Sequence, residues 1–286
     1  MMMIELLFQG LTLGGLYGMI GVGLALSFGI LRVVNLAQGE LITIGAFLAV
    51  GMISLFPALP LALVLAGAFL GCAALGVAMQ ALAVERAMAF RDPMVAMLVT
   101  FGLAVILRNA LVESVGANLR GLDIGGLGQA RVTFGGLSLG LLPLLTLGIA
   151  LLSFGGLALL IFRTRFGRQV RALSDRPEIA ELMGIRIRRV HAQVAALSAG
   201  LAALAGVLLA MRASVSPFSG VAHLLIAFEV VVLGGIGSIR GALGAGLLLG
   251  MTQVVSARFD GNAGLLYVHL VFFVILVLRA ISGRLS

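Results

Sequence analysis

The segment RTRFGRQVRALSDRPEIAELMGIRIRR, residues 163–189, decides how the chain folds, because it is a strongly basic stretch between two long apolar ones. It holds eight arginines, and the flanking residues 139–162 and 190–211 are almost wholly apolar. Each flanking run is long enough to cross the roughly 30 Å of hydrocarbon in a bilayer. Because basic loops between membrane spans face the cytoplasm, we expect 163–190 to be a cytoplasmic loop that orients the whole protein.

The composition of the chain is that of a polytopic helical membrane protein. Of its 286 residues, 61% are hydrophobic and only 10% are charged, a balance that excludes a soluble domain. The apolar runs are continuous over about 20 residues, which excludes the short alternating strands of a β-barrel. We therefore expect an all-α fold with a single transmembrane domain over residues 1–286.

The net charge of +8 comes from arginine alone, since the sequence contains no lysine. A phosphate-binding P-loop needs its lysine, so a partner must hydrolyse any ATP that drives this protein. The arginines cluster at the ends of the apolar runs, which is not the pattern of a nucleic-acid-binding face. His191, His223 and His269 are too far apart to match metal-ligand spacing, and we expect no bound metal or cofactor.

Nine apolar segments can be separated along the chain. They lie at 5–29, 36–56, 61–84, 94–115, 139–162, 190–211, 223–239, 241–257 and 264–281. The seventh and eighth are short and are joined by GGIGSIRG, which lacks both the strand–helix context and the lysine of a phosphate loop and is better explained as a tight bend. We expect about eight to nine transmembrane helices and favour nine crossings; in the alternative, 223–257 re-enters the membrane as a hairpin, and the C-terminus changes side.

The distribution of arginines predicts the orientation. With 163–190 inside and nine crossings, fourteen arginines lie on the cytoplasmic side and four lie outside, in agreement with the positive-inside rule. The N-terminus is then outside and the C-terminus is inside. The loop 116–138 is rich in glycine and lies outside the bilayer, where its RVTF is compatible with a short strand.

Within the basic loop, the sequence predicts a short capped helix. Asp175 and Glu178 have the spacing of a capping box, with Pro177 tolerated in the first turn. Gly184 stands where a helix-ending glycine belongs. Three apolar residues of this helix have little to bury against within one membrane protein: Ile179, Leu182 and Met183. The helix is therefore a candidate docking contact for a cytoplasmic partner; the alternative is a basic loop that lies against anionic lipid headgroups.

Polar residues within or beside the apolar segments form a second set, the candidates for a substrate path: Tyr17, Asn35, Gln38, Glu40 and Glu229. An ionisable group in the membrane costs about 2.5 kcal/mol or more unless it is paired or hydrated, so Glu229 is the strongest acidic candidate. The competing interpretation is structural. In it, Glu229 pairs with Arg108, and Asn35 caps the helix that follows it.

Glycines recur at four-residue spacing in the first apolar segment, at Gly10, Gly14 and Gly18. Small residues at this spacing let two helix backbones approach closely. We expect this stripe to pack against a neighbouring helix of the same chain rather than against another subunit.

Four stretches, in order along the chain, carry a resemblance to a known family. They are GLTLGGLYGMIGVGLALSFGILRVVNLAQGELITIGAFLA, TFGLAVILRNAL, RTRFGRQVRALSDRPEIAELMGIRIRRV and AFEVVVLGGIGSIRGALGAGLLLG. In these stretches the chain resembles the membrane permeases of branched-chain amino acid ABC importers, the LivH type.

The resemblance implies a type II-like importer fold and an assembly of several subunits. The implied partners are a second, related permease chain, two ATPase subunits, and an extracytoplasmic binding protein that meets loops such as 116–138. Residues 167–185 are similar to the coupling segment that enters a cleft on the ATPase. The resemblance thus assigns coupling to Gly167, Arg168, Arg171, Asp175, Pro177, Glu178, Ala180, Leu182, Met183, Gly184 and Ile185.

The sequence departs from the family pattern in places that bear on the substrate. The family often shows Asn-Phe-Ala-His-Gly-Glu where this chain has Leu36 and Gln38. It commonly has a small polar or apolar residue at the position of Glu229, and often proline at that of Arg240. Relatives also carry urea, short amides and aromatic or other small carboxylates.

The sequence therefore predicts the permease subunit of an ABC importer in a bacterial inner membrane, with branched-chain amino acids as the expected cargo. A urea, amide or small-carboxylate permease is one alternative. A self-sufficient channel or ion-coupled carrier is another, but it leaves the capped basic loop unexplained. An intramembrane enzyme would have to use Ser219, Ser238 and His269, and no nucleophile elbow or oxyanion motif accompanies them.

Overall fold

Long apolar helices build the protein, because within hydrocarbon a helix satisfies every backbone N–H and C=O inside its own segment. The structure, a computed structural model, describes residues 2–90, 92–128, 130–134, 137–261 and 263–282. Its long elements are α1 (Met2–Leu31), α2 (Gln38–Leu55), α3 (Leu61–Met79), α5 (Pro93–Val115), α6 (Leu141–Arg163), α9 (Ile187–Arg212), α10 (Gly220–Gly234), α11 (Ile239–Phe259) and α12 (Gly264–Ile281). Its short elements are the π-helix η1 (Gln80–Val84), α4 (Glu85–Met88), the 3-10 helix η2 (Gly125–Gly128), β1 (Arg131–Phe134), β2 (Leu137–Gly140), α7 (Arg165–Asp175) and α8 (Pro177–Leu182).

Eight helices of the described chain are long and apolar enough to cross a membrane. They match eight of the nine predicted segments. The remaining predicted segment, 223–239, corresponds to α10. This helix has 15 residues and a length of about 22 Å, which is too short for the hydrocarbon core. The eight spans agree with the expected eight to nine transmembrane helices, but the favoured count of nine full crossings was wrong. The hairpin alternative was wrong as well, because α11 is long enough to span the membrane by itself. The helix ends early because Gly235 and Gly237 adopt φ of 89° and 76° in the predicted bend.

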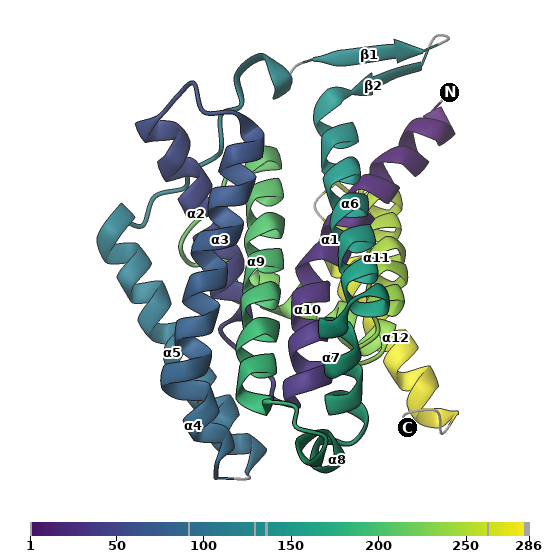
Figure 1. Cartoon of the computed structure of the whole chain (residues 1–286). Helices are drawn as coiled ribbons and strands as arrows, with labels where there is room; N and C mark the ends of the chain where they lie inside the picture. Colours follow the sequence, from purple (N-terminus) through teal and green to yellow (C-terminus); the bar gives the residue numbers. More distant parts are fainter. Residues whose placement is uncertain (1, 91, 129, 135–136, 262, 283–286) are drawn as a thin grey trace.

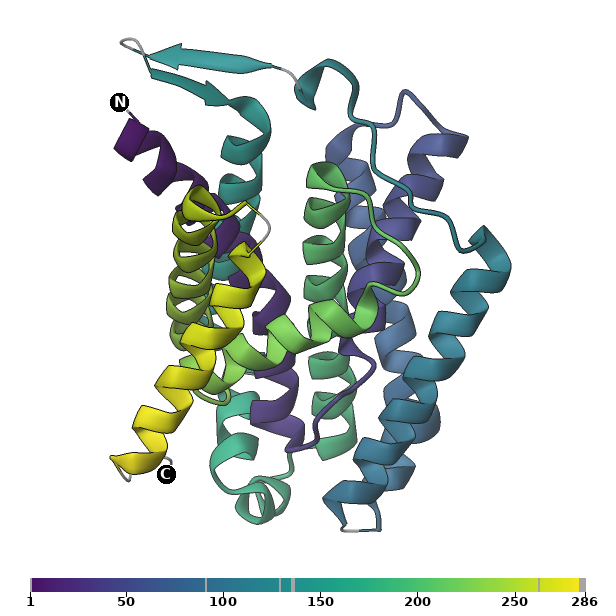
Figure 2. The same ribbon diagram turned by 180° about the vertical axis from the view of Figure 1, so that it is seen from behind.

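Helix α10 lies obliquely across the bundle, and it starts about halfway along the height of the bundle (Figure 2). The chain nevertheless reverses direction through it. As a result, the start of α1 lies at the end of the bundle opposite to α8, and the end of α12 lies on the same side as α8 (Figure 1).

The predicted glycine stripe packs α1 against α11 within the chain. A Cβ on Gly14 would lie 2.6 Å from the Cα atom of Leu247, and one on Gly250 would lie 2.2 Å from the backbone nitrogen of Gly14. These distances are shorter than real Cβ contacts, so only glycine permits this approach of the two backbones. Helices α1 and α9 form the buried centre of the bundle.

A small hairpin lies outside the bundle, at the end opposite to α8 (Figure 1). The predicted RVTF strand is β1, and it pairs antiparallel with β2. Apart from this hairpin and an isolated bridge between Arg120 and Val215, the regular structure of the described residues is helical, as predicted.

Candidate functional site

The basic loop folds into α7 and α8, which project from one end of the bundle (Figure 1). In α8, Ala180 is buried, whereas Leu182 is 87% exposed; Met183, the C-cap of the helix, is 78% exposed. Ile179, on the same short helix, is 47% exposed. An exposed apolar surface that is surrounded by charged residues, here arginines, is typical of a contact for another protein.

Helix α8 ends as the sequence predicted. Gly184 has φ of 81°. Its N–H donates to the Glu181 carbonyl at 2.9 Å, and the Ile185 N–H donates to the Ala180 carbonyl at 3.1 Å. These two bonds form a Schellman motif, in which the left-handed residue is usually glycine and sometimes asparagine.

The start of α8 differs from the prediction. Asp175 is the last residue of α7, and the N-cap of α8 is Arg176, which makes no side-chain cap bond. The predicted capping box was therefore wrong, because the residues before α8 belong to a helix that we did not predict. Pro177 occupies the first turn as expected. Helix α7 is itself capped by Thr164, whose hydroxyl oxygen accepts from the Gly167 N–H at 3.2 Å.

Two of the predicted coupling residues hold α7 against α6. A Cβ on Gly167 would lie 1.9 Å from the Ile161 carbonyl oxygen, so glycine is required at this close approach. Arg171 donates to the same carbonyl, and its guanidinium lies 5.7 Å from the ring centre of Phe162. Other predicted coupling residues are exposed on the surface of this α7–α8 unit: Arg168, Asp175, Pro177 and Glu178.

The α7–α8 unit is also tied to the end of α1. Ser174 of α7 donates its hydroxyl to the Gly29 carbonyl at 2.9 Å, and the Arg32 guanidinium donates to the Ser174 carbonyl at 3.0 Å. Arg32 has φ of 53°, which is unusual for a residue other than glycine. This pair of contacts, which the sequence did not reveal, links the projecting helices to the chain segment that leads into α2.

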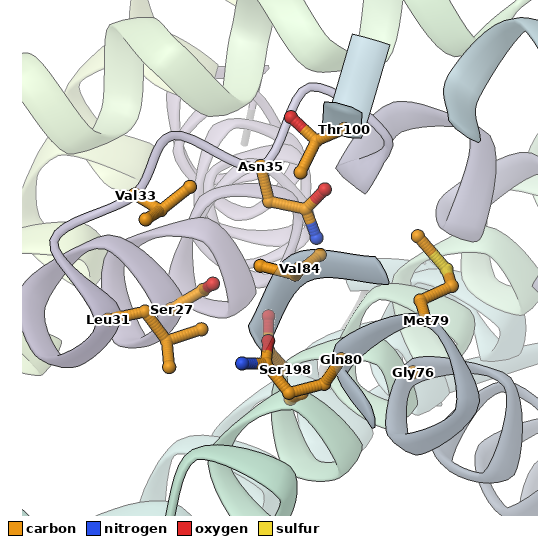
Figure 3. Close-up of a pocket in the computed structure, with 11 residues that line it drawn as sticks. Ser27, Leu31, Val33, Asn35, Gly76, Met79, Gln80, Val84, Thr100 and Ser198 are labelled. Atoms are coloured by element: carbon orange, nitrogen blue, oxygen red, sulfur yellow. The ribbon is translucent and has the colours of Figure 1, made fainter. Parts of the chain in front are cut away.

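That segment, residues 32–37, forms an elbow between α1 and α2. The Leu36 N–H donates to the hydroxyl of Thr100 on α5 at 3.2 Å. The single proton of this hydroxyl faces two carbonyls, that of Met97 at 2.8 Å and that of Val34 at 3.2 Å. Asn35 accepts from the Ala37 N–H at 3.0 Å, so it forms a turn before α2 rather than capping the helix directly, as we had considered. Beside the elbow, a narrow pocket of about 20 Å³, room for about one water molecule, is lined by α1, α3, α5 and α9 (Figure 3).

Gln38 lies at the first position of α2 and is fully buried. Its amide nitrogen donates to the Ser198 carbonyl at 3.3 Å, and its amide oxygen lies 3.2 Å from the Ser198 hydroxyl. The same hydroxyl lies 2.7 Å from the Gly23 carbonyl. Gln38 therefore joins α1, α2 and α9 in this conformation.

Glu40 lies in the first turn of α2 and is 2% exposed. Arg108 of α5 donates through Nε to Oε1 of Glu40 at 3.0 Å, and a second donation from its Nη2 reaches the same oxygen. Oε2 of Glu40 is buried and has no hydrogen-bond partner among the described residues. A buried acid is costly in a membrane unless it is paired, and Arg108 supplies the pairing charge.

Glu229 of α10 is 1% exposed and is paired with His269 of α12. The structural interpretation that paired Glu229 with Arg108 was therefore wrong, because Arg108 binds Glu40 instead. Tyr17 of α1 donates its hydroxyl to Gln253 of α11. The hydrogen bonds of Tyr17 and Glu229 thus lie among α1 and α10–α12, whereas those of Gln38 and Glu40 lie among α1, α2, α5 and α9.

The three side chains that an intramembrane serine–histidine enzyme would need make hydrogen bonds to other residues. Ser238 accepts from the Gly241 N–H at 2.9 Å as the cap of α11, and Ser219 contacts Ser216. His269 is held by Glu229. The described structure shows no contact between these serines and the histidine.

Comparison with known proteins agrees with this geometry. The family model for the branched-chain amino acid transport system permease component matches residues 6–280. The chain belongs to this family. It is 30% identical to the high-affinity branched-chain amino acid transport permease BraD of Pseudomonas aeruginosa, over 96% of this chain and 92% of the relative. It is 29% identical to LivH of Escherichia coli K12, over the same shares.

The chain also resembles a more distant relative, from another organism. The chain is 27% identical to a probable LivH permease of Methanocaldococcus jannaschii, over 86% of this chain and 78% of the relative. No solved structure matches the chain. As a member of this permease family, the protein is a multi-pass membrane component of an ABC-type transport system, which confirms the resemblance seen in the sequence.

Proposed function

We propose that this chain is the permease subunit through which an ABC importer moves branched-chain amino acids across a bacterial inner membrane. The names of its relatives BraD and LivH support this cargo. We place α8 in the cytoplasm, with the N-terminus outside and the C-terminus inside, since fourteen arginines then lie inside and four outside.

We assign no cofactor and no catalysis to the chain itself. ATP is hydrolysed by two partner subunits, because the absence of lysine excludes a P-loop here. A second, related permease chain completes the translocation path, and an extracytoplasmic binding protein delivers the cargo at the end of the bundle that carries residues 116–138.

The observation that carries the proposal is the α7–α8 unit. Leu182 and Met183 present apolar surface at the end of the bundle, and Ser174 is bonded to both Gly29 and Arg32 at the end of α1. A partner that grips α8 can therefore move the end of α1 and the elbow that precedes α2. In alternating access, this movement opens the path at the start of α2 to one side of the membrane or the other.

The proposal is tested by gentle-detergent purification of the tagged chain from its own host, with mass spectrometry of the proteins that accompany it. We expect a P-loop ATPase and a second permease in near-equal amounts. Met183→Asp removes the apolar contact and is expected to lose the ATPase. Leu119→Asp is the control: Leu119 is also an exposed apolar residue, at 68% against 78% for Met183, but it lies outside the α7–α8 unit, so this variant should keep the ATPase. Isolation of the chain alone, intact and monodisperse, would contradict the proposal and favour a channel or carrier.

A further inference from the structure

The first turns of α2 and α10 meet inside the bundle. A Cβ on Gly39 would lie 2.0 Å from the Gly220 carbonyl oxygen, so the two backbones are in direct contact. Gly220 is the first residue of α10, which starts about halfway along the bundle (Figure 2). Two helix N-termini thus converge in the interior, and each carries a positive partial charge of about half a unit.

Glu40 lies at this convergence. Its carboxylate carbon would be 2.5 Å from a Cβ on Gly220, so the carboxylate lies against the first residue of α10. Oε1 is bound by Arg108, while Oε2 is buried without a partner in the described structure. Because an unpaired buried carboxylate oxygen is costly, this oxygen marks a position for a donor.

A second buried atom without a described partner lies on the face of α10 that carries Gly220. Nε2 of His223 makes no hydrogen bond among the described residues. His223 is three residues after Gly220, so both lie on one side of the helix. In the tautomer protonated at Nδ1, Nε2 is an acceptor, as is Oε2 of Glu40.

The charges at this junction favour a ligand that carries both a positive and a negative charge. The negative charge of Glu40 is balanced by Arg108, and the two helix N-termini add about one further positive charge in total. Arg108 has five N–H donors, of which two groups are engaged with Glu40. Half-helix N-termini at the membrane midplane are known to hold carboxylates of transported solutes.

We propose that the junction of α2 and α10 binds the head group of an α-amino acid zwitterion. The ammonium donates to Oε2 of Glu40 and Nε2 of His223. The carboxylate accepts from Arg108 and from the first-turn N–H groups of α10. Glu40 is buried in this conformation, so the site opens when α10 moves away from α2. The inference rests on the proposed function in that the cargo is an amino acid, and it adds the residues of the permease that hold it.

The test uses the assembled importer in detergent, without its binding protein. Thermal shift titrations compare L-leucine with 4-methylpentanoate, which lacks the ammonium, and with isopentylamine, which lacks the carboxylate. We expect leucine to stabilise the complex and each one-charge analogue to bind at least about tenfold more weakly, the effect of losing one charged contact. Equal shifts with all three compounds, or no shift up to the solubility limit, would overturn the inference.

Variants separate binding from folding. Glu40→Gln and Arg108→Gln are each expected to weaken leucine binding at least about tenfold. Glu85→Gln is the matched control, since Glu85 is a paired acid with His191 on α9 and lies outside the junction; it should bind leucine as the wild type does. Wild-type affinity in Glu40→Gln refutes the site. If a variant does not assemble with the ATPase, the analogue series on the wild type decides.

The failure of this inference and that of the proposed function give different results. If the wild-type importer does not take up any branched-chain amino acid in the presence of ATP and its binding protein, the proposed function fails. If wild-type uptake is normal, the importer does not distinguish leucine from its one-charge analogues, and the Glu40→Gln variant transports leucine as the wild type does, only the site at the junction fails.

Discussion

Replacement of Gly184 by alanine is expected to uncouple the transporter while leaving the membrane bundle intact. Gly184 has φ of 81°, and no atom lies within 4 Å of the position of an added Cβ. The cost is therefore the intrinsic one of a left-handed L-residue, about 1–2 kcal/mol, with no clash to add to it. Because α8 has only six residues and so short a helix is marginal in water, this cost falls directly on its folded population.

A loss of 1–2 kcal/mol reduces the ratio of ordered to disordered α8 by about 5- to 30-fold. We expect Gly184→Ala to lower ATP-driven uptake several-fold in proteoliposomes. Gly184→Asn is the control, since asparagine tolerates the left-handed region, and it should stay near wild-type uptake. Gly184→Pro should be worse than alanine, because proline also removes the N–H that donates to Glu181. Undisturbed uptake with both Gly184→Ala and Gly184→Pro would refute the role of α8 in coupling.

Three further changes test other contacts. Ser174→Ala removes the bond to Gly29, worth about 0.5–1.5 kcal/mol, and should lower uptake per ATP hydrolysed while complex formation measured by co-purification is kept; unchanged uptake per ATP would exclude this link. Gly14→Ala places a Cβ 2.6 Å from a backbone atom of α11 and should destabilise the bundle by about 1–3 kcal/mol, seen as a lower Tm, whereas Gly102→Ala meets no atom within 4 Å and should not; equal Tm values would contradict the packing. Arg279→Ala removes donors from the last carbonyls of α10 at 3.0 and 2.8 Å and should speed hydrogen exchange at the end of that helix; unchanged exchange would refute the cap.

Much of the helical architecture could be predicted from the sequence, because long apolar runs have one stable form in a membrane. The end of α8 was also predictable, since a helix commonly ends at a glycine and this signal is local in the sequence. Helix α10 was not placed correctly, because a 15-residue oblique helix has the same composition as a crossing one, and only its flanking glycines indicate where it stops.

The missed helix α7 had a signal in the sequence. Gly167, Val170 and Leu173 recur every three residues and are the buried positions of this helix. Because arginines surround them, the sequence is typical of a charged loop and predicts Asp175 as a helix cap, whereas in the structure Asp175 is the last residue of α7.

The ion pairs of the interior could not be assigned from the sequence. Glu229 and Arg108 were both candidates for pairing, but Glu229 is held by His269 and Arg108 by Glu40. Which buried charges meet depends on the packing of helices far apart in sequence, and no local pattern records it.

The central claim is that this chain transports amino acids only as part of an ATP-driven assembly. The most direct test is leucine uptake by proteoliposomes that contain the purified complex, with the binding protein and with ATP on the side of α8. The account predicts uptake that requires both ATP and the ATPase subunits and that is lost in Met183→Asp. Uptake by the chain alone in the absence of ATP would contradict the account.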